Sequence, residues 1–255
     1  MPKSSTLMAA VAFGSMVLLG CERQPTQPGD QSVPTPDLPS SSFSQGSRQA
    51  PEFEPEDFVA VVDNRFFPLQ PGTRYIYTGE EDGEPVRDVM DVTHSSKTIL
   101  GVKATVVLDR VFQSGALKEK TLDWYAQDER GNVWYLGEDS KEYEDGNVVS
   151  TAGSWEAGKN GARAGIIMPA HPRVGQVTQQ EFAPGIAEDR ARVLRRGVQV
   201  SVPYGGFHGC LETEEFTPLE PGVKEVKFYC SQIGFVKARD VQGGTARLAL
   251  VAVRR

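Results

Sequence analysis

Short stretches in which apolar and polar residues alternate cover most of the chain after residue 70, the clearest running from Val86 to Val92. An alternation of period two places successive side chains on opposite faces of a β-strand. About a dozen such runs are bounded by Gly, Pro, Asn or Asp, and no convincing run has the helical period. The pattern predicts a mainly β fold: one antiparallel meander over residues 51–255, curved into a half-barrel or open barrel.

The expected strands are short and follow one another closely. A single helical turn within 54–62 or 187–194 is compatible with the pattern. The strands are expected at 74–77, 86–92, 101–112, 117–125, 132–136, 141–144, 148–151, 190–194, 198–202, 207–217, 223–230, 235–240 and 245–253.

One long Gly/Pro-rich excursion, Gly153 to Gly185, interrupts this rhythm. Connections longer than about 15 residues are uncommon in compact domains. Trp155 and the apolar run 166–168 argue against a purely disordered segment. We therefore expect an ordered excursion that packs over one end of the sheet.

The N-terminus has the layout of a secretory signal peptide, with Lys3 followed by the nearly uninterrupted apolar run Thr6 to Leu19. This run is too short to span a bilayer as a stable helix. Its end, Leu-Leu-Gly-Cys at 18–21, resembles the lipobox of bacterial lipoproteins. The resemblance implies cleavage of residues 1–20, a diacylglycerol thioether on Cys21, and acylation of the new amino group. An ordinary cleaved signal followed by a stray cysteine is the alternative.

Residues 21–50 are expected to form a lipidated, disordered tether, because they are rich in Pro and Ser and poor in large apolar residues. Removing residues 1–20 takes away one Lys and no acid, which leaves 26 basic against 34 acidic residues, a net charge of −8. This balance excludes nucleic acid as an expected partner. The expected partners are the membrane, through the N-terminal lipid, and an unknown small ligand or envelope protein. The expected location is the cell envelope, on the periplasmic face of either membrane or on the cell surface.

Cys210 and Cys230 flank a turn signal at 218–222. A hairpin centred on Glu220 pairs residues whose numbers add up to 440, so the two cysteines face each other. Directly opposed residues lie within the usual range for a disulfide. The exported compartment is oxidising, and we therefore predict a Cys210–Cys230 disulfide.

A metal site is the alternative for these cysteines, because His208 precedes Cys210 by two residues and shares its face of the strand. Thiolate and imidazole together suit copper or zinc. No further ligand is placed nearby in the sequence. We expect no resident metal or other cofactor.

Catalytic signals are weak. No Gly-x-Ser-x-Gly elbow occurs. His171 is the best general-base candidate, and Glu156 and Glu181 lie in the same excursion, so a hydrolase that uses His171 with either glutamate stays open. The expectation is a non-catalytic protein.

The aromatic residues suggest binding. Trp124 and Trp134 belong to one strand–turn–strand block and could share a face, with Trp155 just beyond. Large aromatics often form β cores. The functional interpretation is an aromatic platform or apolar groove at the mouth of a curved sheet, where an apolar or glycan ligand binds.

Five segments resemble a family of bacterial exported or lipid-anchored proteins of unknown function. They are 64–73, 123–128, 131–135, 154–158 and 165–169, and the resemblance extends from Asn64 to about Val251. It implies no activity and no site residue. More loosely, the meander resembles the open half-barrels of lipoprotein-carrier proteins, an analogy of architecture that does not establish function.

Overall fold

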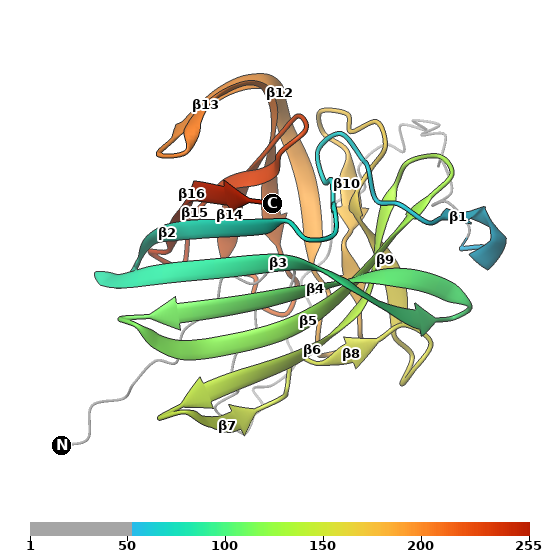
Figure 1. Ribbon diagram of the computed structural model, residues 1–255, viewed down its shortest axis with the longest axis horizontal. Helices are drawn as coiled ribbons and strands as arrows, with labels where there is room; N and C mark the ends of the chain where they lie inside the picture. Colours follow the sequence, from blue (N-terminus) through green and yellow to red (C-terminus); the bar gives the residue numbers. More distant parts are fainter. Residues whose placement is uncertain (1–52) are drawn as a thin grey trace, which may run out of the picture.

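The computed structural model describes residues 53–255 (Figure 1). The predicted signal peptide, Cys21 and the tether lie outside the described residues. One 3₁₀ turn, η1 (Pro55–Asp57), lies within the stretch where a helical turn is compatible with the sequence. The rest of the regular structure is β, as the alternation predicts. No helix in the described part is long and apolar enough to cross a membrane.

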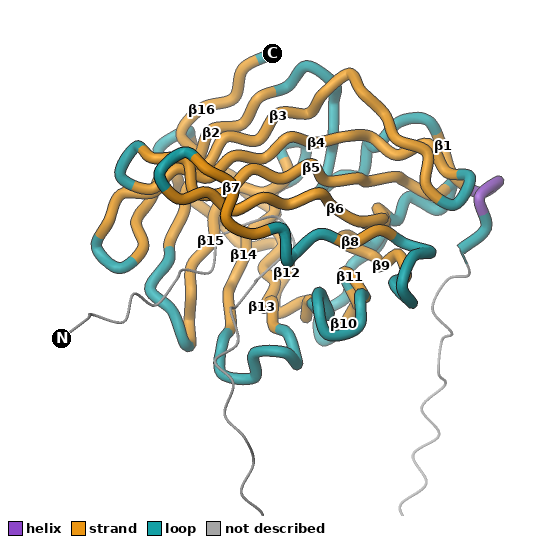
Figure 2. The backbone as a smooth tube through the Cα atoms, turned by 90° about the horizontal axis from the view of Figure 1, so that it is seen from below, coloured by secondary structure: helices purple, strands orange, loops and turns teal. Residues whose placement is uncertain are grey.

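The strands form one antiparallel sheet in the order β10-β12-β13-β14-β15-β16-β2-β3-β4-β5-β6-β9-β11, with β1 on β5 and with β7 and β8 on β6 (Figures 1 and 2). Consecutive strands are neighbours along most of this order, which confirms the predicted meander. The strands are β1 (Phe58–Val59), β2 (Arg74–Glu81), β3 (Glu84–Ile99), β4 (Val102–Gln113), β5 (Ala116–Asp128), β6 (Val133–Glu144), β7 (Asn147–Ser150), β8 (Trp155–Glu156), β9 (Arg163–Met168), β10 (Val177–Gln179), β11 (Glu181–Phe182), β12 (Arg190–Val202), β13 (Gly205–Phe216), β14 (Lys224–Cys230), β15 (Gly234–Gln242) and β16 (Arg247–Arg254).

The sheet curves into a nearly closed barrel. Its two end strands, β10 and β11, are consecutive in the chain and are separated only by Gln180. The chain approaches β9 closely here, because a Cβ on Gly165 would lie 2.3 Å from the carbonyl oxygen of Gln180. Only glycine permits this approach. Gln180 therefore carries the chain from one edge of the sheet to the other.

The Gly/Pro-rich excursion is ordered and supplies the closure. It contains β8, β9, β10 and β11, each of two to six residues. β9 extends the sheet beyond β6, β11 pairs with β9, and β10 pairs with β12. The excursion therefore joins the two edges of the sheet.

The β13–β14 hairpin has the predicted register. Leu211 faces Tyr229 and Thr213 faces Lys227, so the paired numbers add up to 440. Cys210 and Cys230 form a disulfide with a Cα–Cα distance of 4.2 Å, and both are fully buried. The bond links the hairpin ends just beyond the last paired residues.

The core combines aliphatic side chains with large aromatic ones. The largest fully buried side chains include Tyr77, Tyr125, Tyr135 and Tyr229. Tyr125 and Tyr135 stack with ring centroids 4.6 Å apart. The hydroxyl groups of these tyrosines are hydrogen-bonding groups in the interior, and several Asp and Glu side chains are buried with them.

Candidate functional site

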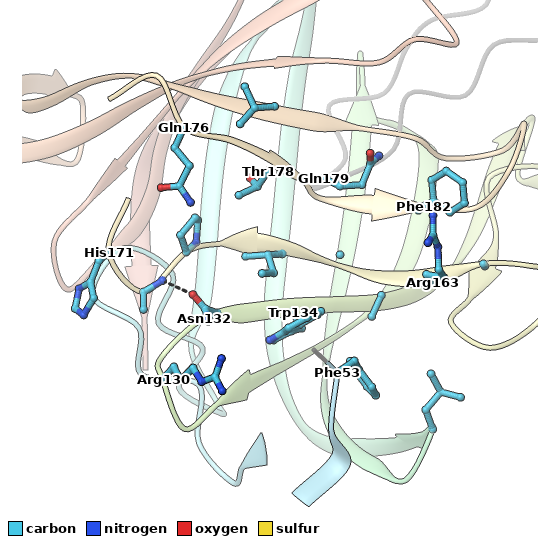
Figure 3. A pocket seen from close by; sticks show the side chains of 18 of the residues that line it. Phe53, Arg130, Asn132, Trp134, Arg163, His171, Gln176, Thr178, Gln179 and Phe182 are labelled. Atoms are coloured by element: carbon cyan, nitrogen blue, oxygen red, sulfur yellow. Dashed lines mark hydrogen bonds between the residues drawn. The ribbon is translucent and has the colours of Figure 1, made fainter. Parts of the chain in front are cut away.

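A groove of about 970 Å³ lies where the excursion closes the barrel, between β6, β9 and the β10–β11 segment (Figure 3). We call it the main groove. Its volume is at the upper end of the range of small-molecule sites. Its walls are largely apolar, with a few polar side chains and with basic groups near the ends. The side chains used below are Phe53, Arg130, Asn132, Trp134, Arg163, Ile166, His171, Arg173, Thr178 and Phe182.

Trp134 forms part of the groove wall and is held in one orientation. Its indole N–H donates to Oδ2 of Asp128 at 2.9 Å. The rings of Phe53 and Phe58 pack on it at centroid distances of 5.5 and 6.0 Å. Trp134 is only 5 % exposed, so it offers a small part of a fixed ring to the groove.

The turn after β9 forms one end of the groove. The Ala170 N–H donates to Oδ1 of Asn132 at 2.9 Å, the dashed line in Figure 3. The Asn64 side-chain amide donates to the carbonyl oxygens of Gly131 and Pro169. These bonds fasten the turn to the β5–β6 connection. His171 follows directly and lies exposed at the rim.

The charged side chains that line the main groove are all basic. Arg130, Arg163 and Arg173 line it, and no carboxylate does. Among residues 53–255, none of the three forms an ion pair. The Arg163 guanidinium lies over the Phe182 ring, 4.3 Å from its centroid. The groove is thus locally basic on a chain whose formal net charge is −7.

A second, smaller groove of about 360 Å³ contains the other two tryptophans of the predicted platform, Trp124 and Trp155. The ammonium group of Lys97 lies 3.2 Å from the centre of the Trp124 ring and covers that face. The indole N–H of Trp155 donates to Glu181 at 3.0 Å. The three tryptophans therefore do not form one platform, and Trp134 alone lines the main groove.

The candidate hydrolase residues are divided between different surroundings. His171 lines the main groove, Glu156 lines the second groove, and Glu181 lines neither. Partial burial of Glu156 opposes its charge, but its hydrogen bonds to Lys97 and Lys159 outweigh burial and lower its pKa. Burial, and next the charge of Asp189, raises the pKa of Glu181 well above its usual range. Neither described groove brings His171 to a glutamate.

The alternative metal site at Cys210 and Cys230 is wrong. Both sulfur atoms are consumed by the disulfide, so no thiolate remains to bind copper or zinc. His208 lies exposed on β13. Within residues 53–255, no cluster of three or more His, Cys, Asp or Glu side chains has a geometry that could hold a metal ion.

A row of buried carboxyl groups extends across β3 to β6, and it was not predicted from the sequence. Asp123 and Glu138 are directly opposed across β5 and β6. The Tyr135 hydroxyl lies 2.6 Å from Asp123 and 2.9 Å from Glu138. One hydroxyl proton serves one acceptor, so both contacts are hydrogen bonds only if a carboxyl group also holds a proton. The row consists of Asp88, Asp109, Glu119, Asp123 and Glu138.

Burial is the main cause that raises the pKa of four of these carboxyl groups, those of Asp88, Asp109, Glu119 and Asp123. It raises the pKa of Asp123 well above its usual range, and the charge of Glu138 acts in the same direction. Burial, and next the charge of Glu138, raises the pKa of Glu119 to about 8. One sequence signal could have indicated the row. Strict alternation over 86–92 places Asp88 on the same face as apolar residues, and a side chain on that face is buried.

A buried cation lies elsewhere in the sheet. Lys227 on β14 is 5 % exposed, and its Nζ lies 2.7 Å from Glu215 and 3.2 Å from Glu225. Burial works against its charge, but these two glutamates outweigh burial and raise the pKa of Lys227. The Tyr229 hydroxyl donates to Glu215 at 2.9 Å. The cluster is internally paired and is best explained as structural.

Comparison with known proteins adds little to this geometry. The sequence matches no protein-family model and no curated protein. The fold is similar to the crystal structure of a Bacteroides fragilis protein described as exported and as having a YmcC-like fold, with 14% identity, a TM-score of 0.42, and coverage of 75% of this chain and 100% of the other. It is also similar to a Parabacteroides distasonis protein described as a lipoprotein, with 10% identity, a TM-score of 0.40, and coverage of 75% and 99%. Neither description transfers to this chain, and the resemblance to an exported family stays a prediction.

Proposed function

We propose that the protein is a lipid-anchored component of the bacterial cell envelope whose β body binds a ligand in the main groove without transforming it. The observation that carries the binding function is the groove itself, about 970 Å³ in volume and walled by Phe53, Trp134 and Phe182. Ligand sites combine such apolar walls with a few polar groups that set orientation. His171 shares neither described groove with Glu156 or Glu181, so no observation favours the hydrolase.

The anchoring part of the proposal is supported by the sequence of residues 1–21. Thioether and amide acylation would give the protein two or more chains, which suffices for stable attachment. Intact-mass analysis of the protein purified from its own envelope tests this. We expect a mass that matches Cys21–Arg255 plus acyl groups, and the variant Cys21→Ser should carry no acyl mass. An unmodified Cys21 would contradict the anchor and leave the groove proposal untouched.

Native mass spectrometry of the full chain purified from the same envelope tests the binding function. We expect a retained ligand of defined mass. Thr178 lines the groove from β10, and Thr178→Trp should narrow it opposite Trp134 and weaken retention. Thr78→Trp is the matched control, because Thr78 is exposed on β2 and does not line the groove. Equal retention by both variants would contradict binding in the main groove.

A further inference from the structure

We infer that the ligand of the main groove is an anionic amphiphile, with its apolar chain against Trp134 and Ile166 and its acidic headgroup at the end formed by Arg130 and His171. This inference rests on the proposed binding function and specifies the chemistry of the ligand. It follows from the distribution of charge around the groove and from the contacts that each basic side chain already makes.

The charge of the groove opposes that of the chain. The formal net charge is −7, yet the charged side chains that line the groove are three arginines and no acid. A neutral ligand would not need this arrangement, and a cationic ligand would be repelled by it. Electrostatic complementarity therefore favours an anion.

The two labelled arginines lie at opposite ends of the groove (Figure 3). Arg163 stands directly across from Phe182 in the β9–β11 pairing, and its guanidinium is occupied by that ring. Arg130 is exposed and has no carboxylate partner among residues 53–255. A guanidinium binds carboxylate and phosphate groups through two parallel hydrogen bonds. Arg130 is thus the better-placed arginine for a headgroup.

A fixed turn brings a second donor to the Arg130 end. Asn132 holds the backbone N–H of Ala170, and the next residue is His171. Figure 3 shows His171 and Arg130 at the same end of the groove, with Trp134 between this end and Arg163. An imidazole N–H can donate to an anion whether or not the ring is charged. The headgroup would therefore meet donors from two separate connections.

Between the two ends, the wall formed by β6 and β9 is apolar, and Thr178 lies across from it. Phe53, Trp134 and Ile166 line this stretch, and the polar atom of Trp134 is turned away to Asp128. A small inorganic anion would leave this surface without contact. An acyl or alkyl chain would cover this surface and remove its own methylene groups from water, which favours binding.

Isothermal titration with four probes tests the inference on the predicted mature chain, residues 21–255, carrying Cys21→Ser. The probes, each used below its micelle concentration, are dodecyl phosphate, dodecanol, dodecyltrimethylammonium and inorganic phosphate. We expect dodecyl phosphate to bind at least about 10-fold more tightly than dodecanol, because one charge-assisted contact is worth about that factor. The difference should shrink at high salt. Inorganic phosphate and the cation should bind more weakly than both.

Three variants locate the headgroup. Arg130→Gln should reduce the preference for dodecyl phosphate over dodecanol to about threefold or less and leave dodecanol binding unchanged. Arg163→Gln should reduce the preference less, and Arg239→Gln, an exposed arginine on β15 outside the groove, should leave it unchanged. A larger effect of Arg163→Gln would overturn the assigned end.

The outcomes separate the inference from the function on which it rests. If neither dodecyl phosphate nor dodecanol binds, the proposed binding of an apolar ligand fails together with the inference. If dodecanol or the cation binds as tightly as dodecyl phosphate, the groove binds chains but the anionic headgroup is wrong. If inorganic phosphate binds as tightly as dodecyl phosphate, the apolar part of the ligand is wrong.

Discussion

The indole N–H of Trp134 donates a hydrogen bond to Oδ2 of Asp128, and this bond fixes the aromatic wall of the main groove. The same carboxylate accepts the backbone N–H and the side-chain amide of Asn132, both at 2.8 Å. Asn132 also accepts the backbone N–H of Ala170, which fixes the chain just before His171. One buried acid therefore orients both the wall and one end of the groove.

Asp128→Ala should destabilise the protein by about 3 kcal/mol, because it leaves the donors of Trp134 and Asn132 without their charged acceptor. Urea unfolding measures the free energy, and a change in the emission of Trp134 should accompany it. Asp139→Ala is the control. Asp139 is partly exposed and makes one surface ion pair, so about 0.5 kcal/mol is expected. Equal effects of the two substitutions would show that Asp128 does not have this role.

The buried carboxyl row predicts a protein that loses stability as the pH rises toward 8. The pKa of Glu119 is about 8 in the folded protein against 4.5 ordinarily. The folded state therefore binds this proton more tightly than the unfolded state. The proton on Glu119 contributes fully to the free energy of unfolding below about pH 4.5. This contribution declines as the pH rises and is lost as the pH passes 8. At about 1.4 kcal/mol per pKa unit, the loss is on the order of 3–5 kcal/mol.

Glu119→Gln keeps an acceptor for the Thr121 hydroxyl and removes the titration. The variant should be more stable than the natural protein at pH 8, and the two should converge near pH 5. Thermal unfolding between these pH values measures the effect. Glu144→Gln, at an exposed position on the same sheet, should leave the profile unchanged. Parallel pH profiles for Glu119→Gln and the natural protein would refute this account of Glu119.

Lys227→Met should cost about 3–5 kcal/mol at pH 8, because Glu215 and Glu225 would remain buried without their cation. The loss should be smaller at pH 5, because burial raises the pKa of Glu225 to about 7, so its carboxyl group can take up a proton when the cation is gone. Chemical denaturation at the two pH values measures the difference. Lys159→Met removes an exposed ion pair with Glu156 and should cost less than about 1 kcal/mol. A similarly small cost for Lys227→Met would argue against the cluster's structural role.

The Cys210–Cys230 disulfide closes a loop with a sequence separation of 20. Constraint of the unfolded chain by such a loop stabilises the fold by about 3 kcal/mol. The natural protein should lose this amount on reduction. The double variant Cys210→Ala, Cys230→Ala should unfold at the same denaturant concentration with and without reductant. Alkylation of both cysteines before reduction, read from the intact mass, would contradict the bond.

The sequence predicts those features of the fold that depend on local pattern. Period-two alternation identifies most strands, and the turn at 218–222 fixes the register between Cys210 and Cys230. The segments expected at 190–194 and 198–202 are one continuous strand, β12, with register shifts where the two were divided. A bulge breaks alternation without ending a strand, so the pattern alone could not distinguish the two cases.

The closure of the barrel and the main groove could not be predicted in the same way. β10 and β11 contain three and two residues, too few for a pattern to register. The groove exists because this closure brings Thr178 and Phe182 opposite Trp134 and Arg130, which precede them by more than 40 residues. Trp134 was identified from the sequence as a candidate binding residue. Arg130 was not, because an arginine beside a turn is indistinguishable from an ordinary surface residue until its neighbours are known.

A crystal structure of the predicted mature chain, residues 21–255 carrying Cys21→Ser, with 12-bromododecyl phosphate bound, tests the central claim most directly. The account predicts one bromine anomalous peak inside the main groove, between Trp134 and Thr178 or beyond them toward Arg163, and phosphate density beside Arg130. Bound ligand whose bromine lies in the second groove, in the barrel interior or on the outer surface would contradict the assignment of the main groove as the binding site.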